Sequence, residues 1–201
     1  MDYQETLFQP IAIGPRTAPN RFVINAMECN DGDADGNPTD KTYRRYRRLF
    51  EGGAGVVILE AITVTDRHRG RDKQLSVMPK NASALAKFVK ETKAVNPETL
   101  FFWQLTHSGE LSHPDFSERV CVKPLYGFGG RVLTEEDVDE VIEQFVTAAK
   151  IAHDAGADGI DFKNCHGYLG SQLVRPYNDR DWKYGGSFEN RTRFTFEVYE
   201  R

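Results

Sequence analysis

Short apolar runs alternate with segments of helical periodicity along this chain. Four apolar runs lie at residues 21–27, 55–63, 99–107 and 158–165. Four segments with apolar positions every three or four residues follow them in turn, at 40–52, 81–95, 134–155 and from about 187 onward. We therefore expect four β-strands, each followed by an α-helix, a pattern that is typical of an α/β fold.

The third helical segment carries the clearest signals at both of its ends. Thr134 and Asp137 have the spacing of a capping box, and Gly156 is a typical residue for ending a helix. Between them runs a stripe of apolar positions, formed by Val138, Val141, Ile142, Phe145, Ala149 and Ala152. One face of this helix is therefore expected to pack against the sheet.

The apolar runs are rich in Val, Ile, Leu and Phe and do not alternate cleanly with polar residues. That composition favours strands buried on both faces of a parallel sheet. The loops after the runs are long and those before them are short, which favours functional residues after the strands. A β/α barrel contains eight such units, whereas this chain offers about four. Two architectures stay open: part of a (β/α)8 TIM barrel, or an open sheet.

Composition and charge narrow the functional classes. The chain has 201 residues, 39% of them hydrophobic and 28% charged, and a net charge of −4, which argues against a nucleic-acid partner. The basic run at 41–48 lies on an expected helix and is interpreted as a solvated face. The sequence offers no membrane-spanning run and no secretory leader. Its three cysteines lack CxxC spacing, so we expect a cytoplasmic protein without a structural metal site.

Polar side chains gather where each expected strand ends. The clusters lie at residues 26–31, 60–61, 104–109 and 163–168. In a β/α barrel the carboxyl ends of the strands meet on one rim, where ligands bind. The four clusters together therefore indicate a binding site for a small molecule.

Three motifs give these clusters a family resemblance. They are WQLTHSG at 103–109, DGIDFKNCHGYLGSQL at 158–173 and YGGSFENRTRF at 184–194. Together with the opening LFQPIAIGPRTAPNRFV, they resemble the N-terminal half of the old yellow enzyme family of flavin-dependent NADH:flavin oxidoreductases and ene-reductases. The resemblance implies a plug segment at 1–20 below a barrel floor, and four βα units of a (β/α)8 barrel over 21–201.

The resemblance also implies which residues border the cofactor FMN. Ala26, Met27 and Glu28 would border the isoalloxazine, and Ala61 would pack beside it. Gln104 would pair with the pyrimidine edge of the flavin, which offers donors and acceptors to an amide that has both. These five residues are the cofactor-binding candidates.

A second set of residues is implied for catalysis. Lys163 and His166 hold the positions of the family's hydrogen-bond donor pair for a substrate oxygen, and Tyr168 holds the position of its proton donor. The implied reaction uses NAD(P)H to reduce FMN, which then passes hydride to an activated alkene such as an enone or enoate. Tyr168 would protonate the other carbon, while the donor pair stabilises charge on the oxygen.

The chain departs from the family pattern at several positions. Lys163 replaces a histidine, so the donor there is a full cation, and a substrate with an anionic oxygen is favoured. Asp161 lies on the same strand face as Lys163 and either neutralises it or leaves it available to substrate or flavin. Glu28 stands where relatives have Thr or Cys, and Glu110 where they have Arg. We hypothesise that Glu28 and Lys163 shift the flavin potential in opposite directions.

A reading from a different functional class stays open. The family's phosphate-binding residues belong to the last βα units, which are not among these residues. The alternative is therefore a non-catalytic half-barrel fragment that requires a partner or a C-terminal half. Open sheet edges favour a homo-oligomer that covers them.

Overall fold

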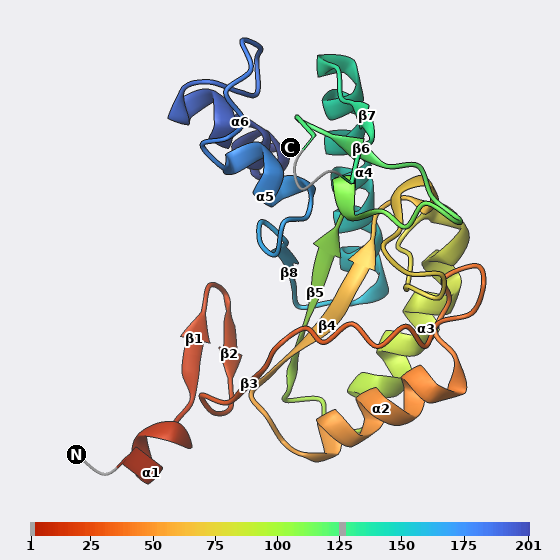
Figure 1. Ribbon diagram of the computed structural model, residues 1–201. Coiled ribbons are helices and arrows are strands. Elements are labelled where there is room, and N and C mark those ends of the chain that lie inside the picture. The colour runs from red at the N-terminus through yellow and green to blue at the C-terminus, as the bar shows by residue number, and fades with distance from the viewer. Residues whose placement is uncertain (1–2, 125–127) are drawn as a thin grey trace. The chain divides into compact units, whose positions relative to one another are not determined.

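The computed structural model describes residues 3–124 and 128–201 and contains an α/β arrangement (Figure 1). The chain divides into two compact units. Unit 1 comprises Met1–Ile62, Lys73–Gln104 and Ile151–Asp161. Unit 2 comprises Thr63–Asp72, Leu105–Lys150 and Phe162–Arg201. Each unit is described by itself below.

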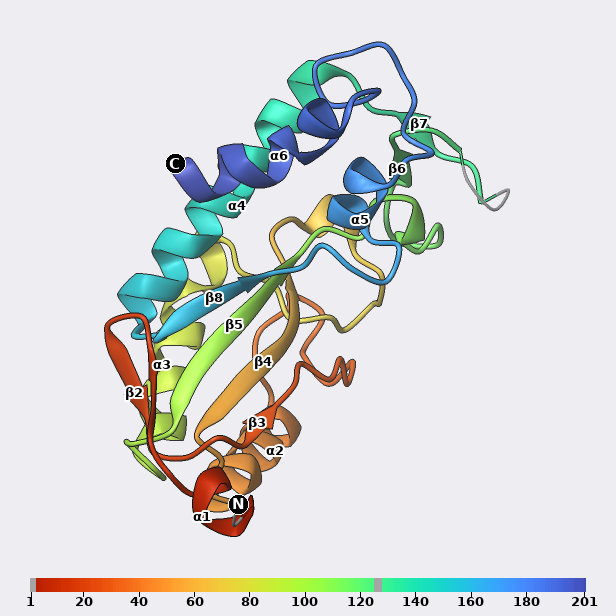
Figure 2. The same cartoon turned by 90° about the vertical axis from the view of Figure 1, so that its left-hand side faces the viewer.

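A four-stranded sheet supplies the framework of unit 1. Its strands, in spatial order, are β3 (Val23–Ile24), β4 (Val56–Thr63), β5 (Leu100–Thr106) and β8 (Gly159–Phe162). β3 pairs with β4 in parallel, with Val23 opposite Val56, and the arrows of β4 and β5 in Figure 2 point the same way. The predicted α/β class with a parallel sheet is confirmed.

The first strand is much shorter than the predicted run of residues 21–27. β3 covers only Val23–Ile24. Beyond it, the backbone N–H of Cys29 donates to the side chain of Glu60 at 3.1 Å. At Cys29 the backbone is therefore held by a buried side chain of β4 and not by a strand partner. Apolar pattern alone does not report such a contact.

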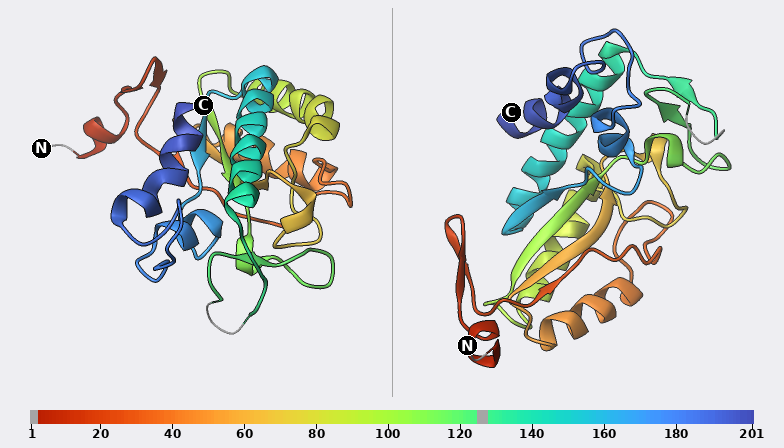
Figure 3. Two further views of the ribbon diagram at one scale, coloured as in Figure 1. Left: turned by 90° about the horizontal axis from the view of Figure 1, so that it is seen from above. Right: turned by 60° about the vertical axis from the view of Figure 1, so that its left-hand side comes forward.

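Two helices of unit 1, α2 (Asp40–Glu51) and α3 (Ala82–Lys93), lie next to each other beside the sheet (Figure 3). An aromatic cluster joins them to β5. The ring centroid of Phe88 lies 5.4 Å from that of Tyr46, and the ring of Phe50 lies 5.1 Å from that of Phe101. Edge-to-face contacts of this kind suit the charge distribution of aromatic rings. Both helices agree with their predicted ranges to within two residues.

The N-terminal segment forms a helix and a hairpin. They are α1 (Tyr3–Leu7), β1 (Ile11–Ile13) and β2 (Arg16–Ala18). Ala18 packs with Val56 and Leu100, close to the first residues of β4 and β5. Ala18 therefore lies beside the residues at which β4 and β5 begin. That residues 1–20 form a plug stays a prediction, and residues 1–2 lie outside the described residues.

Unit 2 is richer in loops and short elements. It holds most of α4 (Glu135–Ala155), then α5 (Leu169–Val174), α6 (Phe188–Glu200), and the paired strands β6 (Val120–Cys121) and β7 (Arg131–Val132). Two short 3-10 helices, η1 (Asp66–His68) and η3 (Gly109–Leu111), complete it, and a third, η2 (Pro79–Asn81), belongs to unit 1. The core of unit 2 contains Phe145, whose ring lies 4.7 Å from that of Phe162 and 6.0 Å from that of Phe194.

The helix ends follow the sequence signals closely. The Thr134 N–H donates to Asp137 at 2.8 Å and the Asp137 N–H donates back to Thr134 Oγ1 at 3.2 Å, which confirms the capping box. Ser187 caps α6 by accepting the Asn190 N–H at 3.2 Å. Gly156 follows α4 with φ 91°, a conformation that favours glycine. Within the described part of the chain, no helix combines the length and apolarity needed to cross a membrane.

Candidate active site

The first group of candidate residues follows β3 in unit 1. Ala26 and Glu28 are half-buried, whereas Met27 is 72% exposed. We call residues 26–28 the wall segment. The segment belongs to no β-strand, and the residues that follow it make side-chain contacts with β4 and α2.

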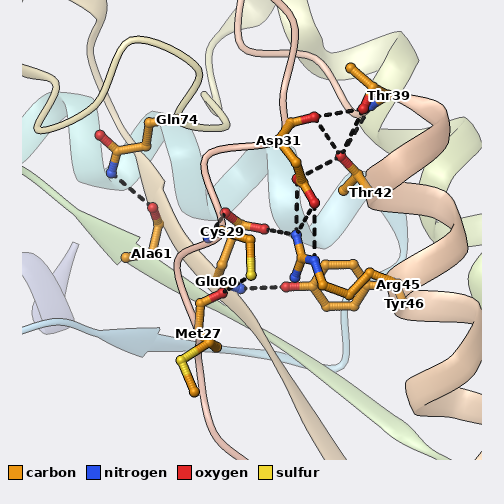
Figure 4. Close-up of polar contacts among 10 residues, drawn as sticks. All are labelled: Met27, Cys29, Asp31, Thr39, Thr42, Arg45, Tyr46, Glu60, Ala61 and Gln74. Atoms are coloured by element: carbon orange, nitrogen blue, oxygen red, sulfur yellow. Dashed lines mark hydrogen bonds and ion pairs between the residues drawn. The ribbon is translucent and has the colours of Figure 1, made fainter.

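Those contacts meet at Glu60, a buried residue of β4 (Figure 4). One carboxylate oxygen of Glu60 accepts the Cys29 N–H at 3.1 Å, and the other pairs with Arg45 of α2. The backbone N–H of Glu60 donates to the hydroxyl of Tyr46 at 2.8 Å. Glu60 therefore links the segment after β3 with helix α2.

Arg45 makes a second ion pair, with Asp31. Its Nε donates to one Asp31 oxygen at 3.0 Å, and its terminal nitrogen donates to both carboxylate oxygens, at 3.0 and 2.9 Å. Thr42 adds a hydroxyl donor to Asp31 at 2.9 Å. Burial raises the pKa of Glu60, and Arg45 opposes that rise. Burial and then the Glu60 charge raise the pKa of Tyr46, so Tyr46 is a neutral hydrogen-bond partner.

The two other candidates in unit 1 are also held by polar contacts. The backbone oxygen of Ala61 accepts from Gln74 at 2.9 Å. The Gln104 amide nitrogen donates to Asp161 at 2.7 Å. Among the described residues, the Gln104 amide oxygen makes no hydrogen bond, so it stays available to a ligand.

The candidate catalytic residues all lie in unit 2. The Lys163 ammonium nitrogen lies 3.8 Å from the centre of the Tyr168 ring, and only 8% of Lys163 is exposed. The electron-rich face of an aromatic ring attracts a cation at this distance. Tyr168 precedes α5 as its N-cap residue. The structure therefore brings Lys163 and Tyr168 together.

His166 occupies the turn between them and has an exposed side chain. Its φ of 58° is left-handed, which is uncommon outside glycine, and the next residue, Gly167, has φ 76°. Its Nδ1 lies 3.0 Å from the thiol of Cys165, which is also exposed. The imidazole also lines a pocket of about 170 Å³, whose other lining residues are Glu110, Leu111, Phe128, Gly167, Gln172 and Arg175.

His107 stands at the end of β5 and is buried. Its Nδ1 accepts the Gly109 N–H at 3.1 Å, so the ring proton lies on Nε2. The His68 ring lies 4.5 Å away, and burial followed by that neighbour holds the pKa of His107 well below its usual range. A neutral, enclosed imidazole of this kind shapes the turn after β5.

Comparisons with known proteins identify the family of this chain. The sequence profile of the NADH:flavin oxidoreductase / NADH oxidase family matches residues 6–201. The chain belongs to this family. The resemblance stated from the motifs is thereby confirmed.

Two curated relatives and one solved structure illustrate the relationship of this family member. It is 36% identical to an NADPH dehydrogenase of Clostridium acetobutylicum, over 96% of this chain and 58% of the relative. It is 33% identical to an NADH oxidase of Thermoanaerobacter brockii, over 100% of this chain and 32% of the relative. Old yellow enzyme from Pichia sp. AKU4542 matches with a TM-score of 0.87 at 26% identity, over 97% of this chain and 55% of that one.

The chain is shorter than these relatives. The chain spans between about a third and three fifths of the length of these relatives. Together with the observed sheet, this coverage corresponds to part of the relatives' barrel. The alternative of an unrelated open sheet is therefore set aside.

Sequence reasoning missed one important residue. Arg45 lies in the basic run 41–48, which was interpreted as a solvated face. That interpretation is wrong for Arg45, whose side chain is 22% exposed and pairs with two acidic residues, but Arg44, Arg47 and Arg48 are exposed. The available signal was its place in the helical period, beside the buried positions Thr42 and Tyr46.

Proposed function

We propose that this chain carries the substrate-binding and proton-donating residues of an FMN-dependent oxidoreductase of the old yellow enzyme type. The observation that carries the proposal is the contact between Lys163 and Tyr168 in unit 2, with His166 on the turn between them. The substrate would be an activated alkene, such as an enone or an enoate. NAD(P)H would be the reductant.

Tyr168 would be the proton donor of this reaction. A phenol is protonated at neutral pH and can still give its proton to a carbon on which negative charge develops. The Lys163 ammonium lies over the face of the Tyr168 ring. Because the cation attracts the negative charge that develops on the phenol, it favours transfer of the phenolic proton. In this role Lys163 assists the donor itself.

His166 would bind the oxygen of the substrate. Its side chain is exposed, and its left-handed backbone turns it out of the line of the strand. Hydrogen bonds to an oxygen that gains charge in the transition state are stronger there than in the ground state, which lowers the barrier. Lys163 would supply a second donor where its ammonium reaches the same oxygen.

Gln104 of unit 1 would pair with the pyrimidine edge of a flavin. The Gln104 amide oxygen is open to an N–H donor, because the amide nitrogen is held by Asp161. Ala26, Met27, Glu28 and Ala61 would border the ring. When bound, FMN supplies the hydride that these protein residues direct to the alkene.

Flavin uptake and turnover test the proposal together. The purified chain is dialysed against FMN, its visible flavin absorbance is measured, and NAD(P)H oxidation is then followed with and without an enone. We expect flavin uptake and enone-dependent oxidation. A chain that binds no FMN and shows no enone-dependent oxidation would contradict the assignment of catalysis to this chain.

The sheet edges support a second proposal, that the chain works only with a partner. β3 and β8 end the sheet, and near β3 the side chains of Phe22 and Val23 are 40% and 51% exposed. Strand edges with apolar neighbours favour pairing with another chain. A second copy covering the β3 edge would make the chain a homo-oligomer. Light scattering across a concentration series tests this, and a monomer throughout would contradict it.

A further inference from the structure

We propose that Arg45 and Glu60 form a buried ion pair that positions the wall segment, residues 26–28. Neither residue is a candidate to touch the cofactor or the substrate, so both are positioning residues. The inference rests on the proposed function only in assigning a cofactor to that wall. The geometry of the pair itself is independent of that assignment.

The carboxylate of Glu60 serves two donors at once. One oxygen accepts the Cys29 N–H, immediately after the wall segment, and the other accepts from the Arg45 guanidinium. Glu60 itself has no exposed surface. A buried carboxylate stays charged only where a cation and hydrogen bonds compensate its loss of water, and Arg45 provides that compensation.

Arg45 also holds the other end of the same stretch of chain. It forms its second ion pair with Asp31, two residues beyond Cys29. The fixed, planar guanidinium can bridge two carboxylates in this way, whereas a lysine ammonium is a point charge on a flexible stem. One side chain of α2 therefore fixes the positions of Cys29, through Glu60, and of Asp31.

The same ion pair also holds the part of the site that lies on β4. Glu60 directly precedes Ala61, another cofactor candidate, whose backbone oxygen accepts from Gln74. Tyr46, the neighbour of Arg45 on α2, accepts the Glu60 N–H (Figure 4). Two stretches that are more than thirty residues apart in sequence are thus held by one helix, and both carry proposed flavin contacts.

A set of matched variants separates positioning from stability. Glu60→Gln keeps the shape but leaves one acceptor oxygen for two donors, so an N–H of the amide must face either Cys29 or Arg45. Arg45→Met/Glu60→Gln removes the competing donor and frees the amide oxygen for Cys29. Arg45→Met/Glu60→Met also removes the buried charges but offers Cys29 no acceptor. Arg47→Met is the control on the same helix, since the Arg47 side chain is 71% exposed and its ion pair among the described residues is with the exposed Glu51.

Hydrogen exchange resolved at the Cys29 amide is the readout, with urea unfolding as a measure of global stability. We expect Glu60→Gln to speed exchange of the Cys29 amide by roughly tenfold or more. At the Cys29 amide, the Arg45→Met/Glu60→Gln variant should return to within about threefold of the wild type, and Arg45→Met/Glu60→Met should not. Near Asp31, which loses the Arg45 guanidinium in both double variants, exchange should stay faster than in the wild type. Equal exchange in all variants, or changes that merely follow global stability, would overturn the inference. Should Glu60→Gln not fold, the two double variants still decide it.

FMN affinity supplies an independent arm of the test. In a chain that binds FMN, affinity should fall with Glu60→Gln and recover in the Arg45→Met/Glu60→Gln variant, while Arg47→Met binds as the wild type does. Unchanged affinity across the series would overturn the link to the cofactor. A wild type that takes up no FMN contradicts the proposed function instead, and the exchange data then decide the positioning inference by themselves.

Discussion

Two regions of the molecule are built in opposite ways. One is the wall segment with Ala61 in unit 1, and the other is the turn in unit 2 that carries Lys163, His166 and Tyr168. The first depends on buried charge, because Glu60 and Arg45 hold the backbone at Cys29, outside the strands. The second depends on local turn geometry, with left-handed backbone at His166 and Gly167. Within unit 2, a cation lies against the proposed proton donor.

The two regions have different proposed tasks, holding a cofactor and handling protons. Residues that hold a cofactor need a rigid surround, which buried and fully paired polar groups provide. Residues that handle protons must be reachable by substrate, and a turn can present them, as it does for the exposed side chain of His166. Substitutions in the two regions should therefore differ in whether stability or catalysis responds.

The largest effect is expected from Tyr168→Phe in unit 2. Removing the phenolic proton should lower the turnover number by about 10²- to 10⁴-fold, because phenylalanine has no proton to give. The aromatic ring remains, so the free energy of unfolding should change by less than about 1 kcal/mol. Stopped-flow alkene reduction and urea unfolding measure the two quantities. Unaltered turnover would remove Tyr168 from the mechanism.

The positive charge of Lys163 should affect which substrates the protein prefers. With a cation in the site, we expect the acid form of an enoate to be preferred over its ester by about tenfold in kcat/KM, and Lys163→Met to abolish that preference. Lys163→His is the matched control, since it restores the family's residue. A preference that survives in Lys163→Met, with lower turnover, would indicate that Lys163 acts on Tyr168 alone.

In unit 1 a smaller effect is expected from Asp161→Asn. Asp161 fixes the Gln104 amide through a charge-assisted hydrogen bond of 2.7 Å. Without the charge the amide can rotate, so FMN affinity should fall by about tenfold or less. Isothermal titration with FMN measures the change, and Gln104→Ala sets the upper limit for it. Affinity that drops further than in Gln104→Ala would point to a direct role for Asp161.

The smallest effect concerns acid stability at the start of α4. Arg131, which donates to Asp137, holds the pKa of that carboxyl at about 2, below the ordinary value of 3.8. A lowered pKa means that the charged form stabilises the folded state above about pH 4 and that this contribution is lost as pH falls toward 2. The difference in unfolding free energy between wild type and Asp137→Asn should vanish over that range. Thermal unfolding at a series of pH values measures it, and a constant difference would contradict it.

Several features were predictable from sequence because they depend on neighbours along the chain. The four helices appear where the apolar periods place them, and Thr134 and Asp137 form the expected capping box. The family followed from short motifs, and its profile match covers residues 6–201. The partners of Asp161 were left open, and one of them proves to be Gln104, a residue of a neighbouring strand.

The sequence by itself determined the order of strands and helices, the helix caps and the identity of the chemical groups, because burial patterns and capping act over a few residues. Only the tertiary structure decided that β3 stops at Ile24, that Arg45 turns inward from a basic run, and that Glu60 binds Cys29. Those outcomes depend on contacts between residues that lie far apart in sequence. A buried charge must find its partner wherever the fold places one, and no local pattern specifies that partner.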